Sequence, residues 1–192
     1  MSASSTLATQ SNPLLDEDTQ LVLSAQKNPA LFQDLYYRWA VPVYQYFYHR
    51  TGEMSSAEDL TSQLFLTVYK SLPRYHHRGH FAAWLFTIAR NLFKEHYRKH
   101  RREVPLEMVQ SLASPSDPSA EYALSDEIRH LVQLVRSLPE EEQELIRLRY
   151  VADLSFADMA VVLNKREDAV KKSLYRLQAR LQTILQNGRL LE

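Results

Sequence analysis

The chain has no cysteine, so disulfide bonds and thiolate metal sites are excluded. Only three glycines occur in 192 residues, which disfavours a turn-rich β fold and favours helices. The longest apolar stretch, 82–89, is interrupted by Thr87 and is too short to cross a bilayer. The Ser/Thr-rich start, 1–13, lacks the basic and apolar regions of a signal peptide. These absences predict a cytoplasmic protein without membrane insertion.

Although the net charge is zero, charges of opposite sign are segregated along the chain. Residues 36–102 hold 11 Lys/Arg against 4 Asp/Glu (+7), residues 103–146 hold 2 against 10 (−8), and residues 147–192 hold 9 against 5 (+4). Two basic blocks around an acidic one indicate two polyanion-binding surfaces; ordinary solvated helix faces are the alternative. We expect the acidic block to fold back over the basic faces in the free protein.

Hydrophobic residues at helical spacing predict an all-α fold of two small domains. A four-helix bundle is expected over 14–102, and a second helical domain over 126–192. Between them, three prolines among polar residues predict a flexible linker over 103–125. Residues 1–13 are expected to be a disordered N-terminus.

Three local features bear on the helices of the first domain. Pro42 is expected to kink the helix that contains it, and Gly52 to end that helix. Ser55 or Ser56 is the expected N-cap of the next helix. These residues therefore predict where two neighbouring helices of the bundle meet.

The most specific pattern is a helix-turn-helix near the C-terminus. Ser155, with Asp158 three positions later, resembles a capping box that begins a short helix. Asn164 tolerates the left-handed backbone of a turn, and Glu167 then begins a longer helix. In helix-turn-helix proteins the second helix lies in the DNA major groove. A plain helical hairpin with a solvated basic face is the alternative.

Side chains suited to DNA line the outer face of that second helix. Lys and Arg attract phosphates, Arg also pairs with guanine, and a carboxylate accepts from cytosine N4. The candidate DNA-binding residues are Glu167, Asp168, Lys171, Lys172, Tyr175 and Arg176.

Several motifs resemble sigma factors of bacterial RNA polymerase. Leu138-Pro-Glu-Glu-Glu-Gln143, together with Leu154-Ser-Phe156, looks like region 4, which binds the promoter −35 element. Ala57-Glu-Asp-Leu-Thr61 is similar to the part of region 2 that docks on RNA polymerase, and Phe81-Ala-Ala-Trp84 with Arg90-Asn91 to the part that recognises and melts the −10 element. Both regions occur in this order without a region 3 between them. The chain thus resembles the extracytoplasmic-function (ECF) group of the sigma-70 superfamily.

The resemblance implies a transcription initiation factor, not an enzyme, that needs no cofactor or metal. Its implied partners are promoter DNA, the clamp helices of the largest subunit of core RNA polymerase, and an anti-sigma factor. The residues implied to bind core polymerase are Asp59, Leu60, Gln63 and Phe65. Those implied to act at the −10 element are Tyr75, His76, His77, Arg78, Trp84, Arg90, Asn91, Lys94 and Arg98. For Trp84, a place in the hydrophobic core is an equal alternative.

Two other functions compete with this interpretation. One is a polymerase-independent helix-turn-helix regulator, although the charge of +7 on the first domain is unexpected for a sensor domain. The other is a metal enzyme, because His76, His77 and His80 cluster, and His96 and His100 have a spacing that suits zinc. No carboxylate motif, phosphate-binding Gly-rich loop or nucleophile–base set accompanies these histidines.

Overall fold

The computed structural model describes residues 13–76, 79–103 and 126–188, and every regular element within these ranges is helical. The all-α fold predicted from the sequence is therefore confirmed. The predicted disordered N-terminus lies outside the described residues except for Pro13, and the predicted linker except for Glu103. Among the described segments, no helix is both long and apolar enough to span a lipid bilayer.

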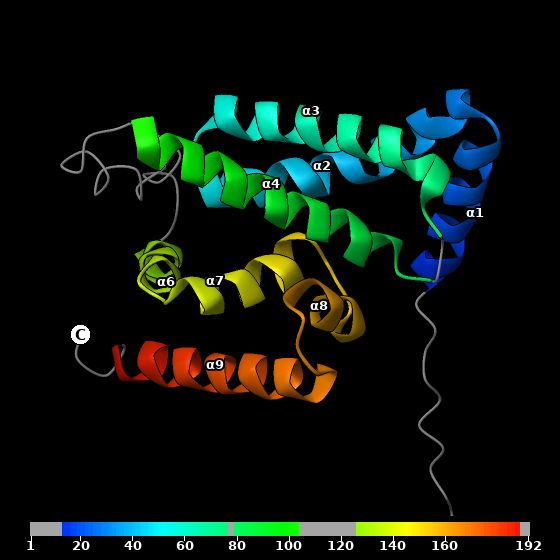
Figure 1. Ribbon diagram of the computed structural model, residues 1–192. Helices are drawn as coiled ribbons and strands as arrows, with labels where there is room; N and C mark the ends of the chain where they lie inside the picture. The colour runs from blue at the N-terminus through cyan, green and yellow to red at the C-terminus, as the bar shows by residue number, and fades with distance from the viewer. Residues whose placement is uncertain (1–12, 77–78, 104–125, 189–192) are drawn as a thin grey trace, which may run out of the picture.

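The N-terminal bundle consists of the four helices α1–α4 (Figure 1). Their bounds are Pro13–Lys27 (α1), Phe32–Thr51 (α2), Met54–Ser71 (α3) and Phe81–Glu103 (α4), with short 3₁₀ turns at Pro29–Leu31 (η1) and Leu72–Arg74 (η2). Apolar residues at helical spacing meet in its core. The largest fully buried side chains of the bundle are Leu35, Tyr46, Phe47, Leu60, Leu64, Phe81, Leu85 and Phe86.

The junction of α2 and α3 differs from the sequence prediction in one respect. Gly52 ends α2 with a left-handed φ of 67°, as expected. Pro42 lies inside α2, which continues past it, and the kink expected there stays a prediction. The expected N-cap at Ser55 or Ser56 is wrong, because α3 begins earlier, with Glu53 at the N-cap position. Both serines lie in the first turn, where their hydroxyls donate to the Glu53 carboxylate at 2.7 Å.

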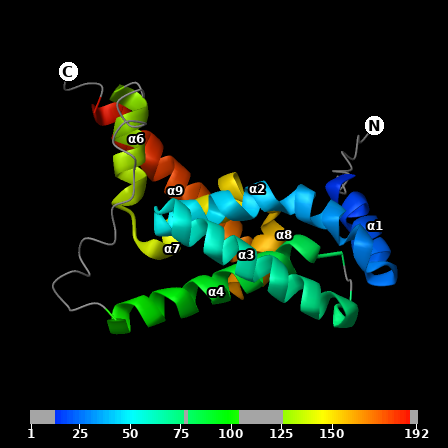
Figure 2. The ribbon, with the colours of Figure 1, turned by 90° about the horizontal axis from the view of Figure 1, so that it is seen from above.

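The C-terminal domain contains α6–α9 and a π-helical turn, η5. Their bounds are Asp126–Arg136 (α6), Glu140–Ile146 (α7), Arg147–Val151 (η5), Phe156–Leu163 (α8) and Glu167–Gly188 (α9). On α9 the apolar side chains of Val170, Leu174 and Leu177 are buried at helical spacing, whereas Ile184 is exposed. Seen from above, α6 crosses α9 near the C-terminal end of α9 (Figure 2).

The two domains pack against each other. Helix α7 lies between α4 and α9, and α8 lies beneath the first turns of α4 (Figure 1). Helix α2 also meets the π-helical turn η5. Buried residues of both domains join in one hydrophobic cluster that extends from Val22 to Leu174.

Candidate nucleic-acid interface

The predicted helix-turn-helix is formed by α8, a short turn and α9. The backbone N–H of Asp158 donates to Ser155 Oγ at 3.1 Å, which caps α8 as expected. The Asp158 carboxylate accepts from the Ser155 hydroxyl at 2.6 Å. Asn164 ends α8 in the left-handed conformation (φ 52°, ψ 47°), and the Lys165 N–H donates to the Ala160 carbonyl across the turn. The local signals in the sequence therefore correspond to a structured turn.

All six candidate residues of α9 lie on its first turns, and all are exposed or half-exposed. Lys171 Nζ lies 2.6 Å from Glu167 Oε1, and this hydrogen bond raises the pKa of Lys171. Lys171 also lies over the ring of Phe156, which packs edge-on against Tyr175. Within the described part of the chain, no acidic side chain pairs with Lys172 or Arg176. These two cations are the most available for phosphate on this face.

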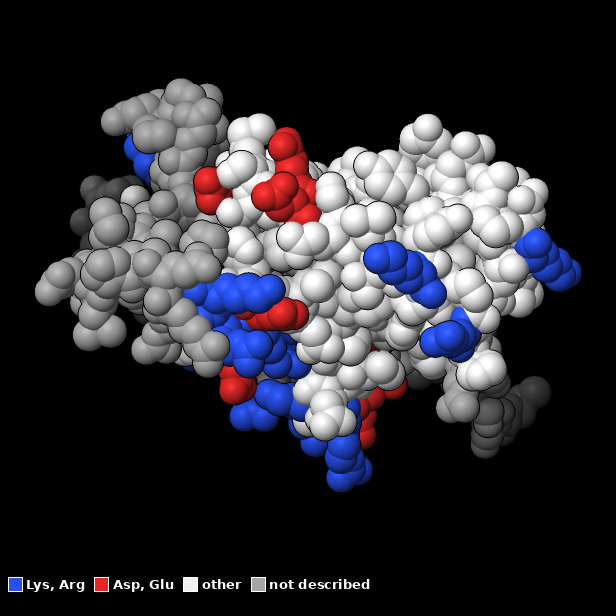
Figure 3. Space-filling view, turned by 45° about the horizontal axis from the view of Figure 1, so that its top comes forward, with Lys and Arg blue, Asp and Glu red and all other residues white. Residues whose placement is uncertain are grey.

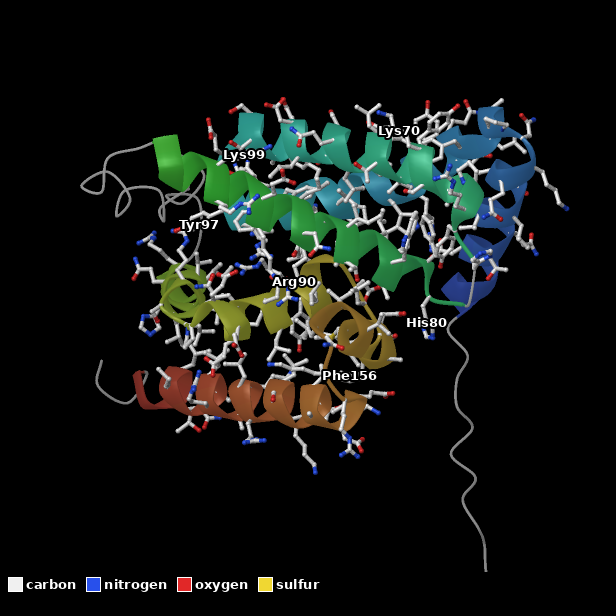
Figure 4. All side chains as sticks on the ribbon, in the orientation of Figure 1. Lys70, His80, Arg90, Tyr97, Lys99 and Phe156 are labelled. Carbon is white, nitrogen blue, oxygen red and sulfur yellow. The ribbon has the colours of Figure 1, made fainter. Side chains whose placement is uncertain are left out.

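The predicted polar −10 residues on α4 separate into two groups. Asn91, Lys94 and Arg98 are exposed and share one side of the helix. Arg90 instead points toward the C-terminal domain (Figure 4). Its Nη1 donates to the Val162 carbonyl at 3.3 Å, and its Nε lies 3.7 Å from Glu144 Oε1. The structure therefore does not bring Arg90 together with the other three.

Where the chain enters α4, aromatic side chains stack. The ring centroids of Tyr75 and Trp84 lie 4.3 Å apart with an interplanar angle of 28°, and Phe81 meets Tyr75 edge-on. Both stacked rings are half-buried, and Trp84 contacts the hydrophobic core while it stacks. Burial, followed by the charge of Asp158, raises the pKa of Tyr75. His76 is exposed, whereas His77 and Arg78 lie outside the described residues.

The four predicted polymerase-binding residues of α3 divide between surface and core. Asp59 and Gln63 are exposed, whereas Leu60 is fully buried and Phe65 is 6% exposed. The ring of Phe65 packs edge-on against that of Tyr36, with the ring centroids 4.7 Å apart. Figure 3 shows Asp and Glu side chains gathered over the start of α3, and Lys and Arg side chains over the C-terminal half of α4. The two faces are therefore electrostatically distinct.

The sequence did not reveal an ion cluster between the domains, which we call the interdomain cluster and define by Tyr46, Arg50, Glu140, Glu144 and Arg147. Arg50 Nη1 lies 3.1 Å from Glu144 Oε2, and Arg50 Nη2 lies 2.7 Å from Glu140 Oε1. Glu144 also accepts from the Tyr46 hydroxyl at 2.8 Å and pairs with Arg147 Nε at 3.3 Å. The side chains of Arg50, Glu144 and Arg147 are at most 7% exposed. Because Arg50 and Glu144 are 94 positions apart, no local motif could have indicated this pairing.

Burial and neighbouring charges shift the pKa values of Tyr46 and Arg50 in this cluster. Burial raises the pKa of the Tyr46 hydroxyl far above its ordinary value, and the charge of Glu144 adds to the rise. Burial acts in the opposite direction on the pKa of Arg50, but Tyr46, Glu144 and Glu140 outweigh it and raise that pKa overall. Tyr46 is therefore the neutral donor and Arg50 the charged donor to the Glu144 carboxylate across the domain interface.

A second polar link joins the domains near the aromatic stack. His80, at the start of α4, has its Nδ1 atom 2.9 Å from Oδ1 of the buried Asp158 of α8 (Figure 4). The capping carboxylate of the helix-turn-helix thus also contacts the bundle. Sequence reasoning identified Asp158 only as a local cap.

The acidic block behaves as a bridge where the structure describes it. Glu140 and Glu144 face Arg50, while on the other side of α7 Glu141 pairs with Lys165 at 3.2 Å and Glu142 pairs with Arg180. Helix α7 therefore contacts basic residues of both domains, and the fold-back of the whole acidic block over the basic faces stays a prediction.

Metal chemistry receives no support from the described residues. Within them, no three His, Asp or Glu side chains gather in a way that could hold a metal ion. His77 lies outside the described residues, and nothing is described of the side chain of His100.

Comparisons with known proteins agree with this architecture. Residues 35–103 match the family described as Sigma-70 region 2, and residues 128–181 match Sigma-70, region 4. The chain is 35% identical over 182 residues to the ECF RNA polymerase sigma factor BldN of Streptomyces coelicolor, covering 90% of this chain and 69% of BldN.

Two solved structures have a similar fold. CnrH in complex with the cytosolic domain of CnrY superposes with a TM-score of 0.64 at 21% identity, covering 87% of this chain and 96% of CnrH. The sigma factor RpoE, in complex with the anti-sigma factor NepR from Bartonella quintana, superposes with a TM-score of 0.61 at 21% identity, covering 81% of this chain and 96% of RpoE. The chain belongs to the ECF RNA polymerase sigma factors of the sigma-70 family, which are transcription initiation factors rather than enzymes and direct RNA polymerase to promoters.

Proposed function

We propose that the chain binds the −35 element through α9 and recognises and melts the −10 element through α4 and the Tyr75–Trp84 stack. The observation that carries this proposal is the presence of two separate exposed surfaces suited to nucleic acid, one on each domain. On α9, Lys172 and Arg176 are suited to phosphate and guanine. On α4, Asn91, Lys94 and Arg98 follow one side of the helix, as a strand backbone requires.

Melting requires no covalent chemistry, only binding energy spent on an unstacked strand. Stacking of a base on an aromatic side chain contributes about 1–3 kcal/mol. The half-buried Tyr75 and Trp84 rings and the exposed His76 offer such a surface next to the basic side of α4. His77 and Arg78 are proposed for the same role on the sequence pattern alone.

Core polymerase is proposed to bind α3, with its clamp helices against the exposed Asp59 and Gln63. Leu60 and Phe65 then contribute from within the bundle, because their packing fixes the face on which Asp59 and Gln63 lie. The two ranges 14–102 and 126–192 are proposed as the functional domains, and 103–125 as the linker between them. A polymerase-independent regulator is not favoured, because region 2 and region 4 occur together.

Arg90 gives the proposal a conformational requirement. In this structure Arg90 donates to Val162 of the C-terminal domain, so it is not free to contact a −10 strand. The domains must therefore separate before Arg90 takes up its proposed role. An anti-sigma partner, by analogy with NepR bound to RpoE, would act by holding the chain away from polymerase.

Run-off transcription with purified core polymerase tests the proposal, with permanganate reactivity of melted thymines as the measure of opening. We expect substitution of Lys171 or Arg176 to weaken use of the −35 element, and substitution of Asn91 or Arg90 to impair opening. Equal effects of these changes on both steps would contradict two separate DNA surfaces. A protein proposed as the anti-sigma factor of this chain must abolish the transcript when it is added to the same reaction.

A further inference from the structure

Gln26, the penultimate residue of α1, contacts the segment that leads into the Tyr75–Trp84 stack. Its side-chain Nε2 donates to the Leu72 carbonyl at 2.8 Å and to the Tyr75 carbonyl at 2.6 Å. A side-chain amide nitrogen carries two hydrogens, so one residue satisfies both carbonyls. Those carbonyls lie at the two ends of the η2 turn, 46 and 49 positions away in the sequence.

Helix α1 is itself held firmly on the bundle. Asp18 is 4% exposed and accepts from Trp39 Nε1 at 3.2 Å and from Arg38 Nε at 3.3 Å. Val22 and Ala25 lie on the same side of α1 and are buried in the core. The end of α1 that carries Gln26 is therefore fixed relative to α2.

The contact with Gln26 fixes Tyr75 at its backbone while its ring is fixed elsewhere. The ring stacks on Trp84 and meets Phe81 edge-on, and both of these residues belong to α4. The exposed His76 follows directly. Tyr75 is thus held by α1 at its carbonyl and by α4 at its ring. The backbone position of the next residue, His76, is therefore also defined.

We propose that Gln26 is a positioning residue for recognition of the −10 element. It holds Tyr75 and His76 in place for an unstacked base without contacting DNA itself, and a surface ordered in advance binds with less entropic loss. The proposal rests on the proposed function of the Tyr75–Trp84 stack. Helix α1 precedes residues 35–103, which match Sigma-70 region 2, so the match assigns no role to Gln26.

The test uses holoenzyme assembled from core RNA polymerase and the full chain, on a duplex selected by run-off transcription with the wild-type holoenzyme. Gln26→Leu removes both donors at similar volume, and Gln20→Leu makes the same change at an exposed position of α1. We expect Gln26→Leu to lower permanganate reactivity about fivefold, as loss of hydrogen bonds of ordinary strength implies. Gln20→Leu should leave reactivity unchanged, and neither variant should change binding to a −35 duplex.

Gln26→Glu is a second variant that retains the shape of the side chain but presents a carboxylate to the two carbonyls. It should impair opening at least as much as Gln26→Leu, while the circular dichroism of both variants stays that of the wild type. Normal opening by either folded variant overturns the proposal.

A double-mutant cycle with His76→Ala separates positioning from a merely structural role. If Gln26 acts through His76, the defects of the two single variants should not multiply, because the effects of coupled residues are not additive. The permanganate reactivity with the double variant Gln26→Leu/His76→Ala should then lie within about twofold of that with the more impaired single variant. If the two defects multiply in the double variant, Gln26 acts independently of His76, which overturns the proposal. Impaired opening with His76→Ala but not Gln26→Leu overturns only the positioning role. Normal opening with His76→Ala removes His76 from the proposed −10 site, and the positioning role of Gln26 through His76 with it.

Discussion

Glu144 of α7 accepts a hydrogen bond from the hydroxyl of Tyr46 in α2 at 2.8 Å, although 98 positions separate the two residues. Arg50, one helical turn after Tyr46, binds the same carboxylate. The link is buried, and a buried charge left wholly unpaired costs about 3–5 kcal/mol. Glu140 still contacts Arg50 when Glu144 is removed, so the cost of losing Glu144 lies toward the lower end of that range or below it. The contact between the two domains therefore depends strongly on a single side chain of α7.

Glu144→Ala is expected to separate the domains. Because the chain has no cysteine, single cysteines at the exposed Gln33 and Gln182 allow a donor and an acceptor dye to be attached. Energy transfer between them should fall in the variant. Glu141→Ala is the matched control, because its pair with Lys165 is exposed and contributes about 1 kcal/mol or less. Unchanged energy transfer in Glu144→Ala would show that apolar packing alone holds the domains together.

Limited proteolysis is expected to cut between residues 103 and 125, because three prolines among polar residues offer little to bury. The two fragments should still elute together on size-exclusion chromatography, since the interdomain cluster joins them. With Glu144→Ala they should elute separately. Resistance of the whole chain to cleavage would contradict the proposed domain boundary.

Lys172→Ala is expected to weaken binding to a −35 duplex at low salt and to reduce the slope of log Kd against log salt by about one. The reason is that each phosphate contact releases a counterion. Fluorescence anisotropy on a labelled duplex measures the slope. Gln182→Ala, farther along α9, is the control and should leave the slope unchanged. An unaltered slope with Lys172→Ala would remove this residue from the DNA-contacting set.

Asp59→Lys is expected to weaken binding to core polymerase at least tenfold, because charge reversal places a cation where an exposed carboxylate is proposed to meet the clamp helices. Binding of labelled chain to core polymerase measures the loss. The melting temperature should not change, since Asp59 is outside the hydrophobic core. Glu17→Lys reverses an exposed charge on another helix and should bind normally.

Asp18→Asn is expected to raise the melting temperature by about 2 °C at pH 7. Burial raises the pKa of Asp18, and the charge and hydrogen bond of Arg38 do not fully offset it. A carboxyl group whose pKa is higher in the folded protein than in the unfolded chain favours folding while it is protonated. Its contribution to stability is fully present below the pKa of the unfolded chain and is lost as the pH rises through the pKa of the folded protein. The ionised group therefore lowers stability at neutral pH.

The difference between Asp18→Asn and the wild type should shrink as the pH falls toward about 4, the ordinary pKa of an aspartate. Thermal melts followed by circular dichroism between pH 4 and pH 8 measure it. Glu17→Gln serves as the exposed control and should show little change. A difference that does not depend on pH would exclude the ionisation of Asp18 as its cause.

Local signals predicted local structure well. Gly52 and Asn164 both end helices with positive φ, and Ser155 caps α8. The prediction failed at Ser55 and Ser56, where the flanking Glu53 took the cap position. For the candidate sites, helical spacing placed Asn91, Lys94 and Arg98 together but could not show that neighbouring Arg90 faces the other domain. Contacts across 72 or more positions depend on how the domains pack, and no pattern within one segment encodes that.

Helix α7 has consequences for tolerance to mutation. It is only seven residues long, yet Glu140 and Glu144 contact the bundle while Glu141 and Glu142 pair with Lys165 and Arg180 of its own domain. Its sequence is therefore constrained from both sides at once. In a saturation library selected for stably folded protein, substitutions at Glu144 should be depleted because they take a carboxylate from the buried Arg50 and Arg147, and those at Leu145 because they disturb the hydrophobic core. A short, acidic helix would thus show the intolerance usually associated with a hydrophobic core.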